Sequence, residues 1–230
     1  HFWRSVPDTF GQRVADYSAL LRRTAAILRE AAPETRVTNG SVVDTRHASA
    51  HAFLRALLEA GCGDSFDILN IHYYNGTRPP ERLPAPPGGE APARDRSLEA
   101  YLDGFRQIQA EFKTAKPVWM TEMGWPTVDP GGWGAVSEAE QAQFMVRSHV
   151  LCFAAGVESV LWFQLAGSEF GLWQAERGPK PGLVAYAQLM RAVCGRAFRC
   201  WLSEGMVRAA VFGAGEEAVI IAWSLEAAEW

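Results

Sequence analysis

The chain has 230 residues, of which 48% are hydrophobic and 21% charged, a composition typical of a globular protein with one large core or two modest ones. Its 22 basic and 26 acidic residues give a net charge of −4. The sequence contains no block of Lys and Arg residues, which argues against binding to nucleic acids and to anionic membranes. No apolar stretch approaches the ~20 residues that span a bilayer. The four cysteines lack the C-x-x-C spacing of a zinc site, and the sequence leaves open whether Cys194 and Cys200 form a disulfide.

The first part of the chain predicts alternating helices and strands. Residues 12–31 carry apolar side chains at a period near 3.6, which indicates an amphipathic helix. A short strand follows and ends at Thr38-Asn39-Gly40, and residues 46–60 repeat the helical period. The next segment, FDILNIHYY, is apolar at nearly every position and predicts a buried strand.

The same alternation continues beyond a long loop. Residues 75–96 are rich in Pro, Gly and Arg and predict a loop, because proline breaks regular structure. A helix over 97–114 and a buried strand over 117–121 follow. Ser137 and Glu140 form a capping box before a helix that runs to about residue 155. The segments SVLWFQL and LVAYAQLMRAV predict a fourth strand and a fifth helix.

Strands that alternate with helices predict βαβ units and a parallel sheet, so residues 1–200 are assigned to an α/β domain. The pattern changes after Cys200. Two strand-like segments, MVRAAVF and AVIIAWS, flank the turn GAGEE and predict an antiparallel hairpin. Residues 201–230 are therefore assigned to the start of a second domain.

Candidate functional side chains follow the predicted parallel strands. In such sheets functional groups gather at the carboxyl ends of the strands. The second strand offers His72 and Tyr74, the third Glu122 followed by Trp125, and the fourth Trp162. Indole rings around a carboxylate suit a carbohydrate, whose C–H faces stack on aromatic rings. Each residue also has a structural alternative: a solvated turn for Glu122, a buried imidazole for His72, and core packing for Trp162.

Four segments carry a resemblance to a known family. DILNIHYY, PVWMTEMGWPT, SVLWFQLAG and FGLWQAERGPKPGLVAY, in this order and spacing, resemble the second half of the retaining (β/α)8-barrel glycosidases of glycoside hydrolase clan A, closest to the β-xylosidase and cellulase-like members. The likeness extends over about residues 1–195. It implies an α/β fold made of strands five to eight of a partial TIM barrel with their helices, followed by the first hairpin of a β-sandwich.

The resemblance also implies a mechanism and the residues that perform it. Glu122 would be the nucleophile, and Tyr74 would hold it ionised and oriented. His72 would bind a sugar hydroxyl or the acid/base, Trp162 would stack under the reacting ring, and Trp125 or Trp173 would line a neighbouring subsite. The implied partner is a glycoside, oligosaccharide or polysaccharide, no metal or organic cofactor is required, and the family favours a secreted or extracytoplasmic location.

One departure from the family is decisive for this chain. The clan's acid/base is the Glu of an Asn-Glu pair that ends strand four, and no Asn-Glu dipeptide occurs in these 230 residues. A full barrel has eight strands, whereas four are predicted here. We therefore expect the C-terminal half of a barrel, inactive by itself, whose partner is the N-terminal half. The alternative is a non-catalytic carbohydrate-binding or scaffold protein derived from such a barrel.

Overall fold

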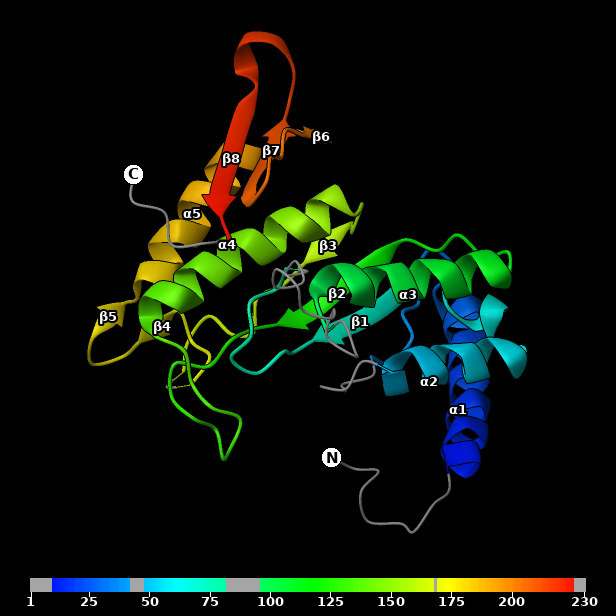
Figure 1. Cartoon of the computed structure of the whole chain (residues 1–230). Helices are drawn as coiled ribbons and strands as arrows, with labels where there is room; N and C mark the ends of the chain where they lie inside the picture. Colours follow the sequence, from blue (N-terminus) through cyan, green and yellow to red (C-terminus); the bar gives the residue numbers. More distant parts are fainter. Residues whose placement is uncertain (1–9, 42–47, 82–95, 168, 226–230) are drawn as a thin grey trace, which may run out of the picture.

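The computed structural model describes residues 10–41, 48–81, 96–167 and 169–225 (Figure 1). The helices and strands follow one another along the chain in an order that matches the predicted alternation. In sequence these are α1 (Phe10–Ala31), α2 (Ala48–Glu59), β1 (Leu69–Tyr73), α3 (Leu98–Glu111), β2 (Val118–Met123), α4 (Glu138–Ala154), β3 (Ser159–Val160), β4 (Trp173–Gln174), β5 (Gly178–Pro179), α5 (Pro181–Val193), β6 (Phe198–Trp201), β7 (Val207–Phe212) and β8 (Val219–Ser224).

A parallel sheet with the strand order β1-β2-β3 lies at the centre of the α/β part. The α/β class with a parallel sheet is therefore confirmed. The predicted first strand is reduced to a single parallel bridge between Thr38 and Ile68. The predicted fourth strand is also shorter than expected, because only Ser159 and Val160 pair with β2. Beyond them the chain stays beside β2, since the amide of Phe163 still donates to the carbonyl of Met123 (2.9 Å).

The helices cover this sheet, and local sequence explains where they begin. Ser137 and Glu140 form the predicted capping box at the start of α4, and the Ser97 hydroxyl accepts from the Ala100 amide to begin α3. Fully buried side chains from β1, β2 and α3 fill the space between the sheet and its helices, including Tyr73, Met120 and Leu98. This close-packed core fixes the strand ends in place.

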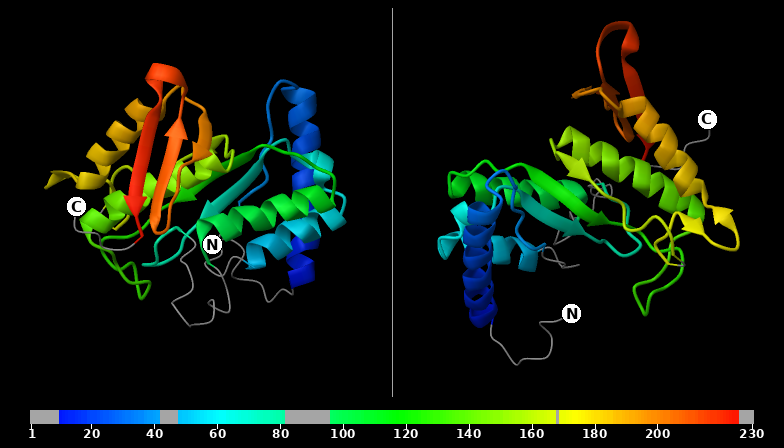
Figure 2. Two further views of the ribbon diagram at one scale, coloured as in Figure 1. Left: turned by 45° about the horizontal axis from the view of Figure 1, so that its top comes forward. Right: turned by 180° about the vertical axis from the view of Figure 1, so that it is seen from behind.

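A second, antiparallel sheet with the order β6-β7-β8 follows the α/β part. The predicted hairpin is present as β7 and β8, but β6 was not predicted, and it spans the expected domain boundary at residue 200. Its short FRCW segment has no clear alternation, so only pairing with β7 makes it a strand. Figure 2 shows this sheet against α4 and α5, at the end of the molecule away from α1.

The antiparallel sheet is attached to the helices by a small core and by one ion pair. Val150 of α4 and Leu189 of α5 pack with Phe212 of β7. Arg208 of β7 donates to Glu99 of α3 at 2.7 Å. Cys194 and Cys200, which flank the start of this sheet, are exposed free thiols. Across the residues placed in the structure, no helix is long and apolar enough to cross a membrane.

Candidate active site at the carboxyl end of the parallel sheet

The β1–β2 pairing brings the predicted carboxylate and imidazole together. The register pairs His72 with Glu122, after an irregularity between Ile71 and His72. Both residues therefore lie at the carboxyl end of the sheet, and Tyr74 follows directly after β1. Three of the predicted site residues thus meet at one edge.

The Glu122 carboxylate is held through one of its oxygens. The Tyr74 hydroxyl donates to Oε2 at 2.9 Å, and Nδ1 of His72 lies 3.2 Å from the same oxygen, within ion-pair distance but without hydrogen-bond alignment. Burial raises the pKa of Tyr74 far above its usual value, and the hydrogen bond to Glu122 raises it further. Tyr74 therefore remains a protonated donor to Glu122. The Glu122 side chain keeps 34% of its surface exposed, so it is open to a ligand.

A chain of polar contacts holds the His72 ring through Nε2, the ring nitrogen other than the one near Glu122. Its Nε2 lies 2.9 Å from Oγ1 of Thr121, whose hydroxyl donates to Oδ1 of Asn70 at 2.6 Å. The backbone N–H of Asn70 donates in turn to Oδ1 of Asn39 at 2.6 Å. Burial lowers the pKa of His72 and outweighs the opposing effect of Glu122, so the ring is mainly neutral at pH 7. Thr121 and Asn70 were not among the predicted site residues, although a polar side chain within a buried strand was the available signal.

The aromatic residues of the SVLWFQL segment are placed differently from the prediction. The Trp162 ring packs against Trp125 (6.1 Å between centroids) and against His149 (6.4 Å), and its Nε1 donates to the Phe170 carbonyl at 3.2 Å. The Phe163 ring, by contrast, lies 6.3 Å from the Tyr74 ring. Phe163, the next residue, thus packs beside the tyrosine that donates to Glu122.

Trp125 and Trp173 differ in their exposure. Trp125 is completely buried, and its indole donates to the Arg78 carbonyl at 2.7 Å. The prediction that Trp125 contacts a sugar is therefore corrected: its ring is enclosed by the core and has a packing role. Trp173 in β4 keeps 38% of its surface exposed.

Lys180, in the segment FGLWQAERGPKPGLVAY, contacts the loop that follows β2. Its Nζ donates to Oγ1 of Thr127 at 2.7 Å, and the Thr127 amide donates to the Glu169 carbonyl at 2.9 Å. Burial lowers the pKa of this ammonium group. Within the described ranges, no cluster of three His, Cys, Asp or Glu side chains could hold a metal ion.

His149 lies beneath Trp162 and makes the protein sensitive to acid. It is fully buried, and burial lowers its pKa from 6.5 to about 4. The unfolded chain therefore takes up a proton below pH 6.5 that the folded chain binds only near pH 4, so stability present above pH 6.5 is lost as the pH falls.

At pH 5 we expect this residue to cost about 2 kcal/mol of unfolding free energy relative to pH 7.5. Urea unfolding of the parent and of His149→Gln at both pH values measures it. The variant should lose about that much less stability than the parent on acidification. Equal losses in the two proteins would contradict the assignment.

No family model matches this sequence, and no curated protein matches it. Solved structures do. A family 39 glycoside hydrolase from Bacteroides cellulosilyticus aligns over 92% of this chain and 44% of its own, at 24% identity and a TM-score of 0.74. A family 128 endo-β-1,3-glucanase from Amycolatopsis mediterranei aligns over 74% of this chain and 65% of its own, at 20% identity and a TM-score of 0.48. A family 17 β-1,3-glucanosyltransferase from Rhizomucor miehei aligns over 76% and 58%, at 16% identity and a TM-score of 0.48.

The chain spans less than half the length of the family 39 protein. At 24% identity this likeness concerns the fold. The predicted resemblance to glycoside hydrolases is confirmed at that level: this chain is similar in fold to part of a family 39 glycoside hydrolase.

Proposed function

We propose that this chain is the C-terminal half of the (β/α)8 barrel of a retaining glycoside hydrolase, with Glu122 as the nucleophile. The observation that carries the proposal is the position of Glu122 at the carboxyl end of β2, held by the Tyr74 hydroxyl at 2.9 Å and with about a third of its side chain exposed. A carboxylate that is oriented in this way suits covalent catalysis at an anomeric carbon.

The proposed reaction has two displacements. Among the described residues, Tyr74 donates a hydrogen bond to Oε2 of Glu122 and none donates to Oε1, so Oε1 is the oxygen that attacks. It forms an ester bond to the anomeric carbon while the glycosidic C–O bond breaks and the leaving oxygen takes a proton from a general acid. Water then attacks the same carbon, gives its proton to the conjugate base, and releases Glu122 as a carboxylate.

The other groups of the site have supporting roles in this proposal. Neutral His72 binds a sugar hydroxyl or the acid/base, and Thr121 with Asn70 keeps its ring in place. In this proposal the aromatic surfaces come from Phe163 beside Tyr74 and from exposed Trp173, which the sequence also predicted for a neighbouring subsite. Because the sequence contains no Asn-Glu dipeptide, the general acid belongs to a part of the whole protein outside these residues, the N-terminal half of the barrel.

A covalent label tests the proposal. An activated 2-fluoroglycoside carries a good leaving group and needs little protonation, and the fluorine slows hydrolysis of the ester, so the intermediate accumulates. We expect peptide mass spectrometry of the whole protein to find the sugar on Glu122. The Glu122→Gln protein should carry no label there.

Two other outcomes would point elsewhere. A label on a different carboxylate would move the nucleophile away from Glu122. Tight sugar binding without any label would favour the carbohydrate-binding or scaffold protein.

A further inference from the structure

A polar depression of about 520 Å³ lies beside the proposed active site. Its lining consists of residues 75–78, Arg96, Gly132 and Trp133. Residues 75–78 directly follow Tyr74, and the Trp133 ring lies 6.1 Å from the Tyr74 ring. Tyr74 is also the residue that donates to Glu122, so the depression lies next to a residue of the carboxylate site. The volume is within the range of pockets that bind small molecules.

The wall that carries Trp133 is held in one conformation. One oxygen of Asp129 accepts four successive backbone amides, from Gly131 to Gly134, at 2.8 to 3.2 Å. These hydrogen bonds lower the pKa of Asp129, and the one from the Trp133 amide has the largest effect. The carboxylate of Asp129 therefore binds amides of its own loop. Gly134 has a φ of +79°, and a Cβ there would lie 2.8 Å from the Thr77 side chain. The two loops therefore approach closely, and Trp133 is presented with 45% of its surface exposed.

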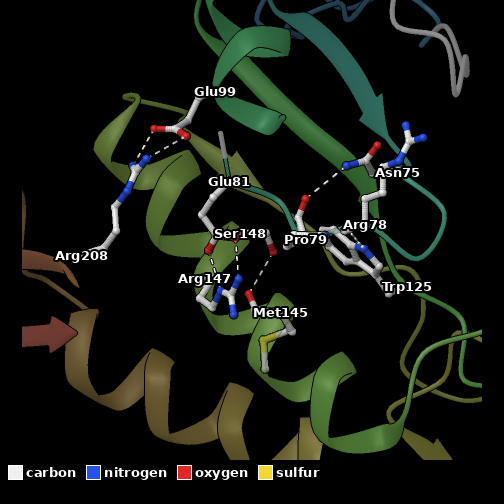
Figure 3. A network of polar contacts seen from close by, with 10 residues as sticks. All are labelled: Asn75, Arg78, Pro79, Glu81, Glu99, Trp125, Met145, Arg147, Ser148 and Arg208. Atoms are coloured by element: carbon white, nitrogen blue, oxygen red, sulfur yellow. Dashed lines mark hydrogen bonds and ion pairs between the residues drawn. The ribbon is translucent and has the colours of Figure 1, made fainter. Parts of the chain in front are cut away.

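The charged groups of the depression favour a ligand that carries an anionic group. The described lining residues include two arginines and no acidic residue. Arg78 is exposed, and its guanidinium makes no ion pair or hydrogen bond with any residue that the structure places. Asn75 is 95% buried; its Nδ2 donates to the Pro79 carbonyl at 3.2 Å, while its Oδ1 accepts no hydrogen bond from the described part of the chain. Figure 3 shows Arg78 and Asn75 next to each other on this loop.

We propose that this depression is a subsite for a sugar ring that carries a carboxylate. The guanidinium of Arg78 would bind the carboxylate, and Trp133 would contact the apolar face of the sugar. This proposal rests on the proposed glycosidase function for its substrate, and it names a substrate class for the same site: glycosides that contain a uronic acid.

Binding of three small probes tests the subsite without any need for turnover. The whole protein, with Glu122→Gln in place, is titrated with methyl β-glucuronide, methyl β-glucoside and methyl β-glucoside 6-sulfate. Fluorine NMR of protein labelled with 5-fluorotryptophan follows Trp133, whose signal is assigned with Trp133→Phe. We expect the glucuronide to shift that signal and to bind about five- to tenfold more tightly than the glucoside, since an exposed charge pair is partly screened.

The matched variants locate the preference. Arg78→Gln should bind the glucuronide and the glucoside with about equal affinity, and its affinity for the glucoside should be that of the parent. Arg78→Lys should keep part of the preference for the glucuronide. Arg23→Gln, which removes the same charge from an exposed position on α1, should bind all three probes like the parent. A preference that survives Arg78→Gln, or equal affinity for glucoside and glucuronide, would overturn the subsite. A sulfate that binds as tightly as the carboxylate would overturn the uronic acid assignment.

These results are separate from the test of the nucleophile. A fluorosugar label on Glu122, together with equal affinities for the glucuronide and the glucoside, would reject the subsite and leave the hydrolase proposal in place. A preference that depends on Arg78, in a protein that takes no label, would reject the hydrolase and retain the subsite.

Discussion

Replacing Glu122 with Gln in the whole protein is expected to lower kcat/KM for an aryl glycoside by at least about 10⁴-fold. The amide is nearly isosteric with the carboxylate, so Tyr74 and His72 remain in place, but the amide cannot form the glycosyl ester. Steady-state kinetics measure the loss, and calorimetric titration with the product sugar is expected to show binding within a few fold of the parent.

Tyr74→Phe should reduce activity less than Glu122→Gln does, and it serves as a comparison in the same kinetic measurements. It keeps the ring contacts with Phe163 and removes only the hydroxyl that donates to Oε2 of Glu122. Loss of one such donor is expected to cost about 10² to 10³ in kcat. If Glu122→Gln retained activity within tenfold of the parent, the nucleophile would be a different residue.

Removing the Glu81 side chain is expected to cost about 3 to 5 kcal/mol of unfolding free energy. Glu81 is fully buried and accepts from Nε and Nη2 of Arg147 at 2.5 and 2.6 Å (Figure 3). In Glu81→Ala the guanidinium would remain in the interior, 13% exposed, without its counter-ion. Urea unfolding gives the change in free energy from the midpoint and the slope.

The exposed pair between Glu138 and Arg177 is the matched control. Its two side chains are 30% and 68% exposed, so Glu138→Ala should cost no more than about 1 kcal/mol. Replacing both members of the buried pair, as in Glu81→Ala with Arg147→Leu, should recover part of the loss because no unpaired charge is left inside. Equal costs for Glu81→Ala and Glu138→Ala would contradict the role of the buried pair in holding the segment before residue 82 on α4.

The sequence by itself predicted the features that depend on local pattern. The period of 3.6 residues located α1, α2 and α3, and the capping box located the start of α4 at Ser137. Continuous apolar runs located β1 and β2, because a strand buried on both faces needs no polar side. The positions of His72, Tyr74 and Glu122 at the ends of those strands followed from the same runs.

The tertiary structure alone decided which side chains point where. In a near-continuous apolar segment such as SVLWFQL the alternation is absent, so the sequence could not distinguish Trp162, which packs on Trp125, from Phe163, which faces Tyr74. Trp125 follows a strand end, as a site residue would, yet its ring is completely buried and packs against Tyr73 and Phe144. Likewise β6 is a strand only because β7 pairs with it, and Thr121 and Asn70 act on His72 only because the register of β1 on β2 brings them together. Pairing and burial involve residues far apart in the chain, and no local pattern encodes which of them will meet.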